Sequence, residues 1–434
     1  MAVTSTAPLR IAIAGLGTVG GGIARLLHQQ SQALAERAGR PLQLVAVSAR
    51  DRHKDRGLAL DGVTWVDDPV ALAAMPGVDV VVELMGGSEG AARSLVERSL
   101  AAGRPVISAN KALIAHHGAA LARLAEQGGT TLAYEAAVAG GIPIIKMLRE
   151  GLVGNEVKRI YGILNGTCNY ILTTMRESGR EFGDVLADAQ KLGYAEADPA
   201  FDVDGIDAAH KLAILAALAF GAEVDFEHVH VEGIRHIGAQ DIAYAAELGL
   251  RIKLIGLAQL VDGELEQRVS PCLVPLAAPI ATVEGVFNAV VAEGDFVGTV
   301  MAEGRGAGAG PTASAVAADL VDLARGRALP PFALPAAQLR RRPARSLEAR
   351  RGAYYLRLMV VDRPGVIADV AAALRDEDIS MESMIQRGRA PGEVVSVVMT
   401  THDTTEAAMR RALARIKDLK AVVAEPRPLR IESF

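Results

Sequence analysis

The most constraining feature of the chain is a glycine-rich turn between its first apolar segment and its first helical pattern. Gly15-Leu-Gly17-Thr-Val-Gly20 follows the predicted strand Arg10–Ala14 and precedes the predicted helix Ile23–Arg37. In such a turn the first glycine bends the chain, the second lets the backbone approach a pyrophosphate, and the third packs the helix on the strand. Because the helix N-terminus also attracts anions, the turn predicts a dinucleotide-binding βαβ unit with Gly15, Gly17 and Gly20 at the cofactor.

Short apolar runs continue to alternate with helical patterns through the first third of the chain. The further predicted strands are Leu42–Val47, Asp79–Leu84, Pro105–Ser108 and Thr130–Tyr134. Strands that alternate with helices are typical of a parallel sheet built from βαβ units. We therefore predict an α/β fold whose first domain, residues 1–142, is a Rossmann-type doubly wound parallel sheet.

The pattern changes at about Pro143, which indicates a second domain over 143–310. Strand-like segments such as Val157–Ile163 and Arg251–Val261 alternate there with helical ones, which predicts an α+β substrate-binding and dimerisation domain. We expect the apolar helix over 311–327 to pack back onto the first domain. Residues 328–351 are rich in proline and arginine, and we interpret them as a solvated linker rather than a nucleic-acid-binding segment.

The C-terminal residues 352–434 form a separate predicted module. Its order of elements is strand, helix, strand, strand, helix, strand, from Tyr354 to Arg430, and the last strand is expected over 421–431. The β-α-β-β-α-β order predicts a ferredoxin-like fold.

Composition excludes several classes of protein. Lys and Arg total 46 and Asp and Glu 51, a net charge of −5, which argues against binding to nucleic acid or to an anionic membrane. Hydrophobic residues make up 50% and charged ones 22%, which excludes a mostly disordered chain. We see no signal peptide or transmembrane run, and the two cysteines cannot form a disulfide framework. We therefore expect a cytoplasmic protein.

Residues after the second predicted strand bear on the choice of cofactor. An NAD site usually carries a carboxylate at this strand end for the ribose 2′-hydroxyl, whereas a guanidinium suits the 2′-phosphate of NADP. Arg50 occupies this position, with Lys54 nearby, and we therefore predict that the cofactor is NADP(H). Asp51 leaves the use of NAD(H) open as well.

A second concentration of chemistry surrounds one apolar helix. Asp207 and Lys211 are spaced i, i+4 and share a helix face, and the helix continues as LAILAALAF. A helix this apolar is buried, and a buried lysine needs a partner. With Glu196, Asp198 and Asp202 just upstream, the acids could hold a substrate ammonium while a lysine exchanges a proton with a substrate oxygen. Lys111, after another strand end, is a further candidate.

Together these motifs resemble those of homoserine dehydrogenases. The shared segments occur in the family's order between residues 10 and 325: the glycine turn, Ser108–Lys111, Glu135–Pro143, Asn165–Tyr170, Gly193–Pro199, Gly205–Lys211 and Gly306–Ser314. The terminal module, with Val361-Asp-Arg-Pro-Gly-Val366, resembles an ACT domain, which senses amino acids. The resemblance implies reversible, NAD(P)-dependent interconversion of L-homoserine and L-aspartate 4-semialdehyde, in threonine and methionine biosynthesis.

The resemblance also implies roles for single residues. Lys211 would exchange the proton at the reacting oxygen, and Lys111 would be a second lysine near nicotinamide and substrate. Glu196 and Asp207 would hold the substrate, with Asp202 behind them. The chain departs from the family pattern at Ala200-Phe201, where other members carry an arginine or an acidic residue after Asp-Pro.

Cofactor and cation ligands follow from the same resemblance. Gly17, Thr18 and Val19 would contact the pyrophosphate, and Gly193 and Gly308 would contact the cofactor elsewhere. In some members a monovalent cation, Na⁺ or K⁺, is held largely by carbonyl oxygens, here at Glu135, Val138, Gly140 and Ile142. The ACT module implies an amino-acid effector, for which we expect threonine, and a homodimer or homotetramer.

Rival interpretations remain open at this point. Cys168 could be the nucleophile of a phosphate-dependent semialdehyde dehydrogenase, with its pKa lowered by the start of a helix. The chain could also be a nucleotide and amino-acid sensor without catalysis. Zinc binding by His228, His230 and His236 is less favoured, because they lack a nearby cysteine.

Overall fold

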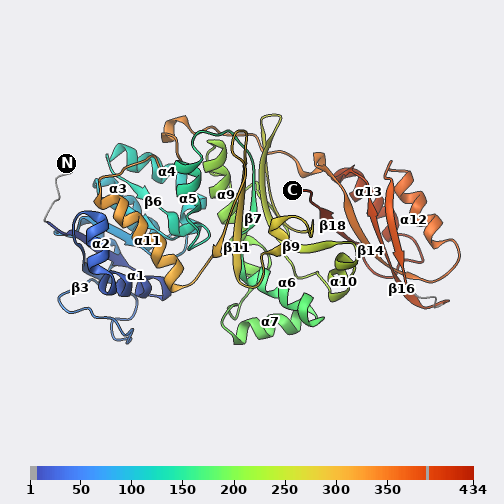
Figure 1. Cartoon of the computed structure of the whole chain (residues 1–434), viewed down its shortest axis with the longest axis horizontal. Coiled ribbons are helices and arrows are strands. Elements are labelled where there is room, and N and C mark those ends of the chain that lie inside the picture. Colours follow the sequence, from blue (N-terminus) through green and yellow to red (C-terminus); the bar gives the residue numbers. More distant parts are fainter. Residues whose placement is uncertain (1–6, 388–390) are drawn as a thin grey trace.

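The computed structural model describes residues 7–387 and 391–434 and places three units in a row (Figure 1). A parallel sheet with its helices lies at the N-terminal end, a long mixed sheet occupies the middle, and a smaller α/β module lies at the C-terminal end. In the part of the chain that is described, no helix combines the length and apolarity needed to cross a membrane.

The N-terminal unit is a doubly wound parallel sheet with the strand order β3-β2-β1-β4-β5-β6. Its strands are β1 (Leu9–Ala14), β2 (Leu42–Ser48), β3 (Thr64–Trp65), β4 (Val80–Glu83), β5 (Val106–Ser108) and β6 (Leu132–Ala133). Its helices are α1 (Thr18–Gln29), α2 (Ser31–Ala38), α3 (Ala91–Ala101) and α4 (Lys111–Gln127). Buried aliphatic side chains such as Ile11 and Ile13 fill the space between the sheet and the helices. The Rossmann-type fold class is confirmed.

Helix α11 (Ala309–Ala324) returns from the far end of the sequence to pack beside α1 in this first unit (Figure 1). The approach is close, since a Cβ added to Gly22 would lie 2.7 Å from the carbonyl oxygen of Ala309. Only glycine allows two backbones to come this near.

The middle unit is organised around a ten-stranded sheet with the main order β12-β11-β7-β9-β10-β18-β14-β16-β15. Strands from the middle of the sequence are β7 (Val157–Ile163), β8 (His230–Val231), β9 (Leu250–Val261), β10 (Glu264–Pro275), β11 (Phe287–Gly294) and β12 (Gly298–Arg305). The accompanying helices are α5 (Ile144–Lys146), α6 (Gly166–Ser178), α7 (Phe182–Lys191), α8 (Ala200–Val203), α9 (Ile206–Phe220) and α10 (Ala239–Glu247). The apolar helix α9 packs on β7, β9 and β10 and puts its catalytic candidates inside the protein.

The C-terminal module shares its sheet with the middle unit. Its elements are β13 (Arg351–Gly352), β14 (Tyr354–Val361), α12 (Val366–Arg375), β15 (Met381–Gln386), β16 (Val394–Thr401), β17 (Thr404–Thr405), α13 (Glu406–Lys417) and β18 (Arg427–Ile431). Strand β18 pairs antiparallel with β14 and parallel with β10, so one strand belongs to both units. The strand expected over 421–431 was too long, because the structure begins β18 only at Arg427.

The predicted linker is more buried than a solvated connector, and that expectation is wrong for part of it. Phe332 is fully buried against Tyr134, whose hydroxyl donates a 2.6 Å hydrogen bond to the carbonyl of Pro331. At the other end, Arg350 is buried and forms a 2.6 Å ion pair with Glu432. The high proline and arginine content predicted exposure, but Phe332 and Arg350 bury the two ends of the segment.

Candidate active site

The glycine turn between β1 and α1 has the shape that a pyrophosphate requires. Gly15 adopts a φ of +99°, and a Cβ there would lie 2.6 Å from the carbonyl oxygen of Leu84. A Cβ on Gly20 would lie 1.9 Å from the carbonyl oxygen of Gly15, whereas Gly17 has open space around it. No side chain caps α1 at Gly17, so its first N–H groups face outward for an anion. The turn therefore fits a dinucleotide cofactor.

Basic residues dominate the loop that follows β2. Arg50 is exposed, while one carboxylate oxygen of Asp51 accepts hydrogen bonds from the backbone N–H groups of His53 and Lys54. Arg56, which no sequence motif marks, donates to the carbonyls of Asp51 and of Leu16 in the glycine turn. Asp51 is thus engaged within its own loop, and the nearby charges are mostly guanidinium and ammonium groups.

A cavity of about 530 Å³ lies between the nucleotide domain and the middle unit. Nine of the predicted site residues line it: Val19, Lys111, Gly140, Gly193, Glu196, Asp202, Asp207, Lys211 and Gly308. Its walls include parts of α1, α4, α6, α9 and β11, the turn before α5 and the loops before α8 and α11. Segments that are far apart in the sequence, from Val19 to Thr312, therefore meet at one cavity.

Asp207 joins the two candidate lysines. Its Oδ1 lies 2.9 Å from Nζ of Lys111, and its Oδ2 lies 2.7 Å from Nζ of Lys211. Asp207 and Lys211 are buried. Burial alone would raise the pKa of Asp207, but the two ammonium groups outweigh it and hold the pKa well below its usual range. Asp207 is therefore stabilised as a carboxylate between the two lysines.

Asn165 positions this cluster at the start of α6. Its Oδ1 accepts from the backbone N–H of Cys168 and caps the helix, while Nδ2 donates to Asp202 and to Asp207, each at 2.8 Å. From the sequence, Asn165 was placed only within the shared segment Asn165–Tyr170, without a role of its own. The signal was an asparagine before a helix, which is a common cap.

Phe201, where this chain differs from the family pattern, contacts Lys111. The Lys111 ammonium lies 5.4 Å from the centroid of the Phe201 ring, within reach of a cation–π interaction. Lys111 also begins α4 directly after Asn110, whose side chain caps that helix. Ring and cap both hold Lys111 toward Asp207.

The remaining acids differ in their surroundings. Asp202 accepts from Asn165 and, at 3.4 Å, from the hydroxyl of Thr167, and burial together with Asp207 raises its pKa. Glu196 is exposed at the cavity wall. The structure therefore brings Asp202 beside the lysine cluster and leaves Glu196 at the rim.

The predicted cation ligands lie around a tight turn. Both carboxylate oxygens of Glu135 accept 2.9 Å hydrogen bonds from the backbone at the start of α5, from Ile145 and Lys146. Ala139 and Gly140 both have positive φ, at 54° and 49°. The Glu135 carboxylate is thus a helix cap, and the geometry leaves carbonyl oxygens as the donors that a hard cation would use.

Two rival sites lose support. Cys168 is buried, and burial raises the pKa of its thiol well above the usual range, so the expectation that the helix start would lower it is wrong. The histidines have separate carboxylate partners, Asp225 for His228 and Glu232 for His230. Among the described residues there is no group of three or more His, Cys, Asp or Glu side chains placed to hold a metal ion.

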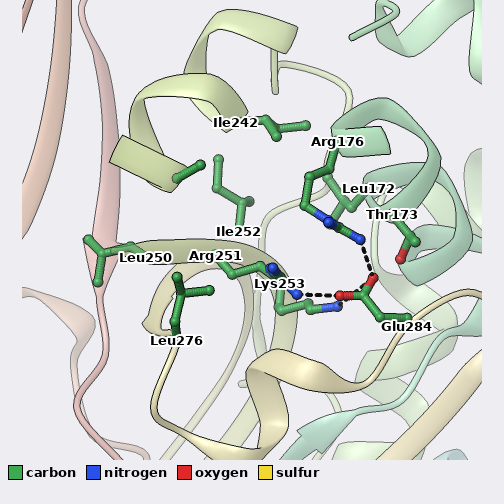
Figure 2. A pocket seen from close by; sticks show the side chains of 11 residues that line it. Leu172, Thr173, Arg176, Ile242, Leu250, Arg251, Ile252, Lys253, Leu276 and Glu284 are labelled. Atoms are coloured by element: carbon green, nitrogen blue, oxygen red, sulfur yellow. Dashed lines mark hydrogen bonds and ion pairs between the residues drawn. The ribbon is translucent and has the colours of Figure 1, made fainter. Parts of the chain in front are cut away.

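A second, smaller pocket lies among residues of α6, α10 and β9 (Figure 2). Glu284 forms ion pairs with Arg176, Arg251 and Lys253, as Figure 2 shows. Lys253 is buried, which lowers its pKa to about 8, and its ammonium donates to Oδ1 of Asn169 in α6. Sequence reasoning missed this cluster because Lys253 lies inside a predicted strand without a motif.

The chain matches three family descriptions that together cover most of its length. These are "Homoserine dehydrogenase, NAD binding domain" over residues 15–135, "Homoserine dehydrogenase" over 143–321 and "ACT domain" over 354–421. The three matches correspond in order to the three structural units.

Individual proteins agree with these matches. A homoserine dehydrogenase of Neisseria gonorrhoeae is 43% identical, over 98% of this chain and 99% of that protein. The crystal structure of a homoserine dehydrogenase from Thiobacillus denitrificans aligns with a TM-score of 0.93 and 44% identity, over 99% of each chain. A hyperthermophilic archaeal homoserine dehydrogenase in complex with NADPH aligns with a TM-score of 0.62 and 28% identity, over 73% of this chain and 97% of that one.

Proposed function

The chain belongs to the homoserine dehydrogenase family, and from that premise we propose that Lys211 is the proton carrier for the interconversion of L-homoserine and L-aspartate 4-semialdehyde. The enzyme is an oxidoreductase that acts on a CH–OH group with a nicotinamide cofactor. The observation that carries the proposal is the Lys211–Asp207–Lys111 cluster in the wall of the cavity, in which Asp207 and Lys211 are buried.

The proton transfer follows from the hydrogen bonds of Lys211. Among the described residues its ammonium has two acceptors, Oδ2 of Asp207 and the carbonyl of Leu164, each at 2.7 Å. One of its three hydrogens is therefore left for a substrate oxygen. In reduction Lys211 gives that proton to the oxygen of the aldehyde as it becomes a hydroxyl, and in oxidation it takes the proton back.

Hydride transfer itself is supplied by the nicotinamide, which when bound exchanges hydride with C4 of the substrate. The chain's contribution is orientation. Gly17 leaves open space for the pyrophosphate, Gly15 and Gly20 allow the close backbone packing of the turn, and the uncapped start of α1 offers N–H groups. Arg50 and its basic neighbours suit a 2′-phosphate, which supports a preference for NADP(H) with NAD(H) as a weaker alternative.

Asp202 and Glu196 are the acids best placed to bind the substrate ammonium. Both oxygens of Asp207 are already occupied by Lys111, Lys211 and Asn165. Asp207 therefore acts mainly by orienting the lysines, while Asp202 and Glu196 face the cavity with fewer partners. Asp202→Asn and Glu196→Gln are expected to raise the KM for homoserine more than they lower kcat.

Initial rates of nicotinamide reduction with L-homoserine test the proposed reaction. We expect turnover with both coenzymes and the higher kcat/KM with NADP. Failure to reduce either coenzyme with homoserine would exclude the reaction. Dependence on inorganic phosphate, together with loss of activity in Cys168→Ser, would instead indicate the phosphate-dependent alternative.

The ACT domain supports control by an amino acid, and we expect threonine, since homoserine is a precursor of threonine and methionine. Strand β15 forms one edge of the ten-stranded sheet, and such an edge can pair with a second subunit, which supports a homodimer or homotetramer. Threonine titration of the full chain tests the effector. Light scattering after gel filtration tests the assembly, and a monomer would contradict it.

A monovalent cation at the turn of Glu135, Val138, Gly140 and Ile142 remains part of the proposal. Its support is the sharp turn of backbone at Ala139 and Gly140. Activity and melting temperature measured in Na⁺, K⁺ and tetramethylammonium salts of equal ionic strength test it. Identical values in all three would exclude it.

A further inference from the structure

Asn288 presents an unsatisfied amide at the active-site cavity. It is the second residue of β11 and is only 1% exposed. Both polar atoms of its side chain, Nδ2 and Oδ1, are buried and have no hydrogen-bond partner among the described residues. Buried amides in proteins are nearly always paired, because an unpaired one is costly. The unpaired amide therefore indicates that Asn288 binds a ligand.

The Asn288 amide packs closely against two glycines, Gly306 and Gly166. A Cβ on Gly306, in the loop that leads into α11, would lie 2.2 Å from Nδ2 of Asn288. A Cβ on Gly166, the first residue of α6, would lie 3.4 Å from Oδ1. Asn288, Gly166 and Gly306 all line the cavity that also receives Lys211. The amide thus lies between the loop before α11 and the start of α6, in the wall of the cavity.

The pair of unsatisfied atoms selects the kind of ligand. One atom donates and the other accepts, so a partner satisfies both only if it accepts and donates side by side. A primary carboxamide does this, whereas a carboxylate offers acceptors alone and would leave Oδ1 of Asn288 unpaired. Resting on the proposed function, we propose that Asn288 binds the carboxamide of the nicotinamide through a reciprocal pair of hydrogen bonds, and so orients the ring for transfer at the end of the cavity lined by Lys211.

Direct binding measurements on the full chain test this contact apart from catalysis. Dissociation constants are measured by fluorescence titration for NADPH and for its 3-acetylpyridine analogue, in which a methyl group replaces the amide nitrogen. In the wild type the analogue should bind about 3- to 10-fold more weakly, since it lacks the hydrogen bond to Oδ1. This comparison needs no variant that has to fold.

Variants then assign the loss to Asn288. Asn288→Ala is expected to weaken NADPH about 10-fold or more and to bring NADPH and the analogue to similar affinities. Asn288→Asp keeps an acceptor, so it should still prefer NADPH over the analogue. Asn155→Ala is the matched control, because that amide bonds to Leu152 and Val297 in a loop outside the cavity.

Each contrary result has a distinct meaning. If Asn288→Ala leaves both dissociation constants unchanged while the KM for homoserine rises, the amide contacts the substrate carboxylate and the proposal is overturned. A lowered melting temperature with unchanged binding and KM shows that Asn288 only supports packing, which also overturns it. Failure of the proposed function is a different observation, namely no hydride transfer with homoserine by the wild type.

Discussion

Deleting the ammonium of Lys211 is the sharpest test of the proposed chemistry. Lys211→Met keeps an apolar stem of equal length within the buried helix α9, with sulfur in place of Cδ, and removes the Nζ ammonium. A positioned acid–base group contributes about 10²- to 10⁴-fold in rate, so kcat should fall by that factor, a change in barrier of about 3–5 kcal/mol. Since the glycine turn is untouched, the dissociation constant of NADPH should stay within about 2-fold of the wild type.

The geometry also predicts how stability responds, which separates catalysis from folding. After Lys211→Met, Asp207 still has Lys111 at 2.9 Å and Asn165 at 2.8 Å. Asp207→Asn, by contrast, leaves both lysines without their carboxylate, and breaking a buried pair in this way costs about 3–5 kcal/mol. Lys211→Met should therefore melt nearer to the wild type than Asp207→Asn does.

The assay is the initial rate of nicotinamide reduction with saturating homoserine, accompanied by NADPH titration and a thermal melt. Lys191→Met serves as the control, because that side chain is exposed on α7. A kcat for Lys211→Met within about 10-fold of the wild type would refute the assignment of proton transfer. Equal melting temperatures for Lys211→Met and Asp207→Asn would refute the proposed role of Asp207.

Three further outcomes follow from the charged groups. Burial and the nearby Asp319 raise the pKa of Glu135 from 4.5 to about 7. Between these pH values the folded state holds a proton that the unfolded chain loses, so the free energy of unfolding should fall as pH rises from about 4.5 to about 7. In melts at pH 5 and pH 8, the melting temperature of Glu135→Gln should fall less than that of the wild type. Arg430→Ala removes the guanidinium that joins Glu232 and Glu406 at the junction of the ACT domain, so inhibition by the effector should weaken several-fold in titrations, with basal kcat retained. Arg50→Ala should lower the NADP/NAD ratio of kcat/KM by about 10-fold if Arg50 binds the 2′-phosphate.

The junction also determines how the regulatory domain can be studied. Strand β18 lies between β10 and β14, so removing residues 352–434 would uncover the edge of β10. It would also remove Phe434, which stacks on Tyr161 at a centroid distance of 3.9 Å. An exposed central edge promotes aggregation. Point variants in the full chain are therefore the informative test of regulation.

Much of the fold and part of the site could be predicted from local patterns. The alternation of strands and helices, the glycine turn and the β-α-β-β-α-β order each depend on neighbouring residues, and each predicted its unit of the structure. The spacing of Asp207 and Lys211 likewise placed both on one helix face, where they form a 2.7 Å ion pair. Periodicity and turn chemistry are properties of short segments, so they can be read without the tertiary structure.

Contacts between distant segments were decided only by the tertiary structure. Lys111 meets Asp207, and Asn288 meets Gly166 and Gly306, because separate loops converge at one cavity. The sharing of β18 between two units gave no periodic signal, since a strand's pattern records burial of its faces and not the identity of its neighbours. Sequence determined which segments form helices and strands; packing determined which polar atoms meet, and which of them, such as the amide of Asn288, are left for a ligand.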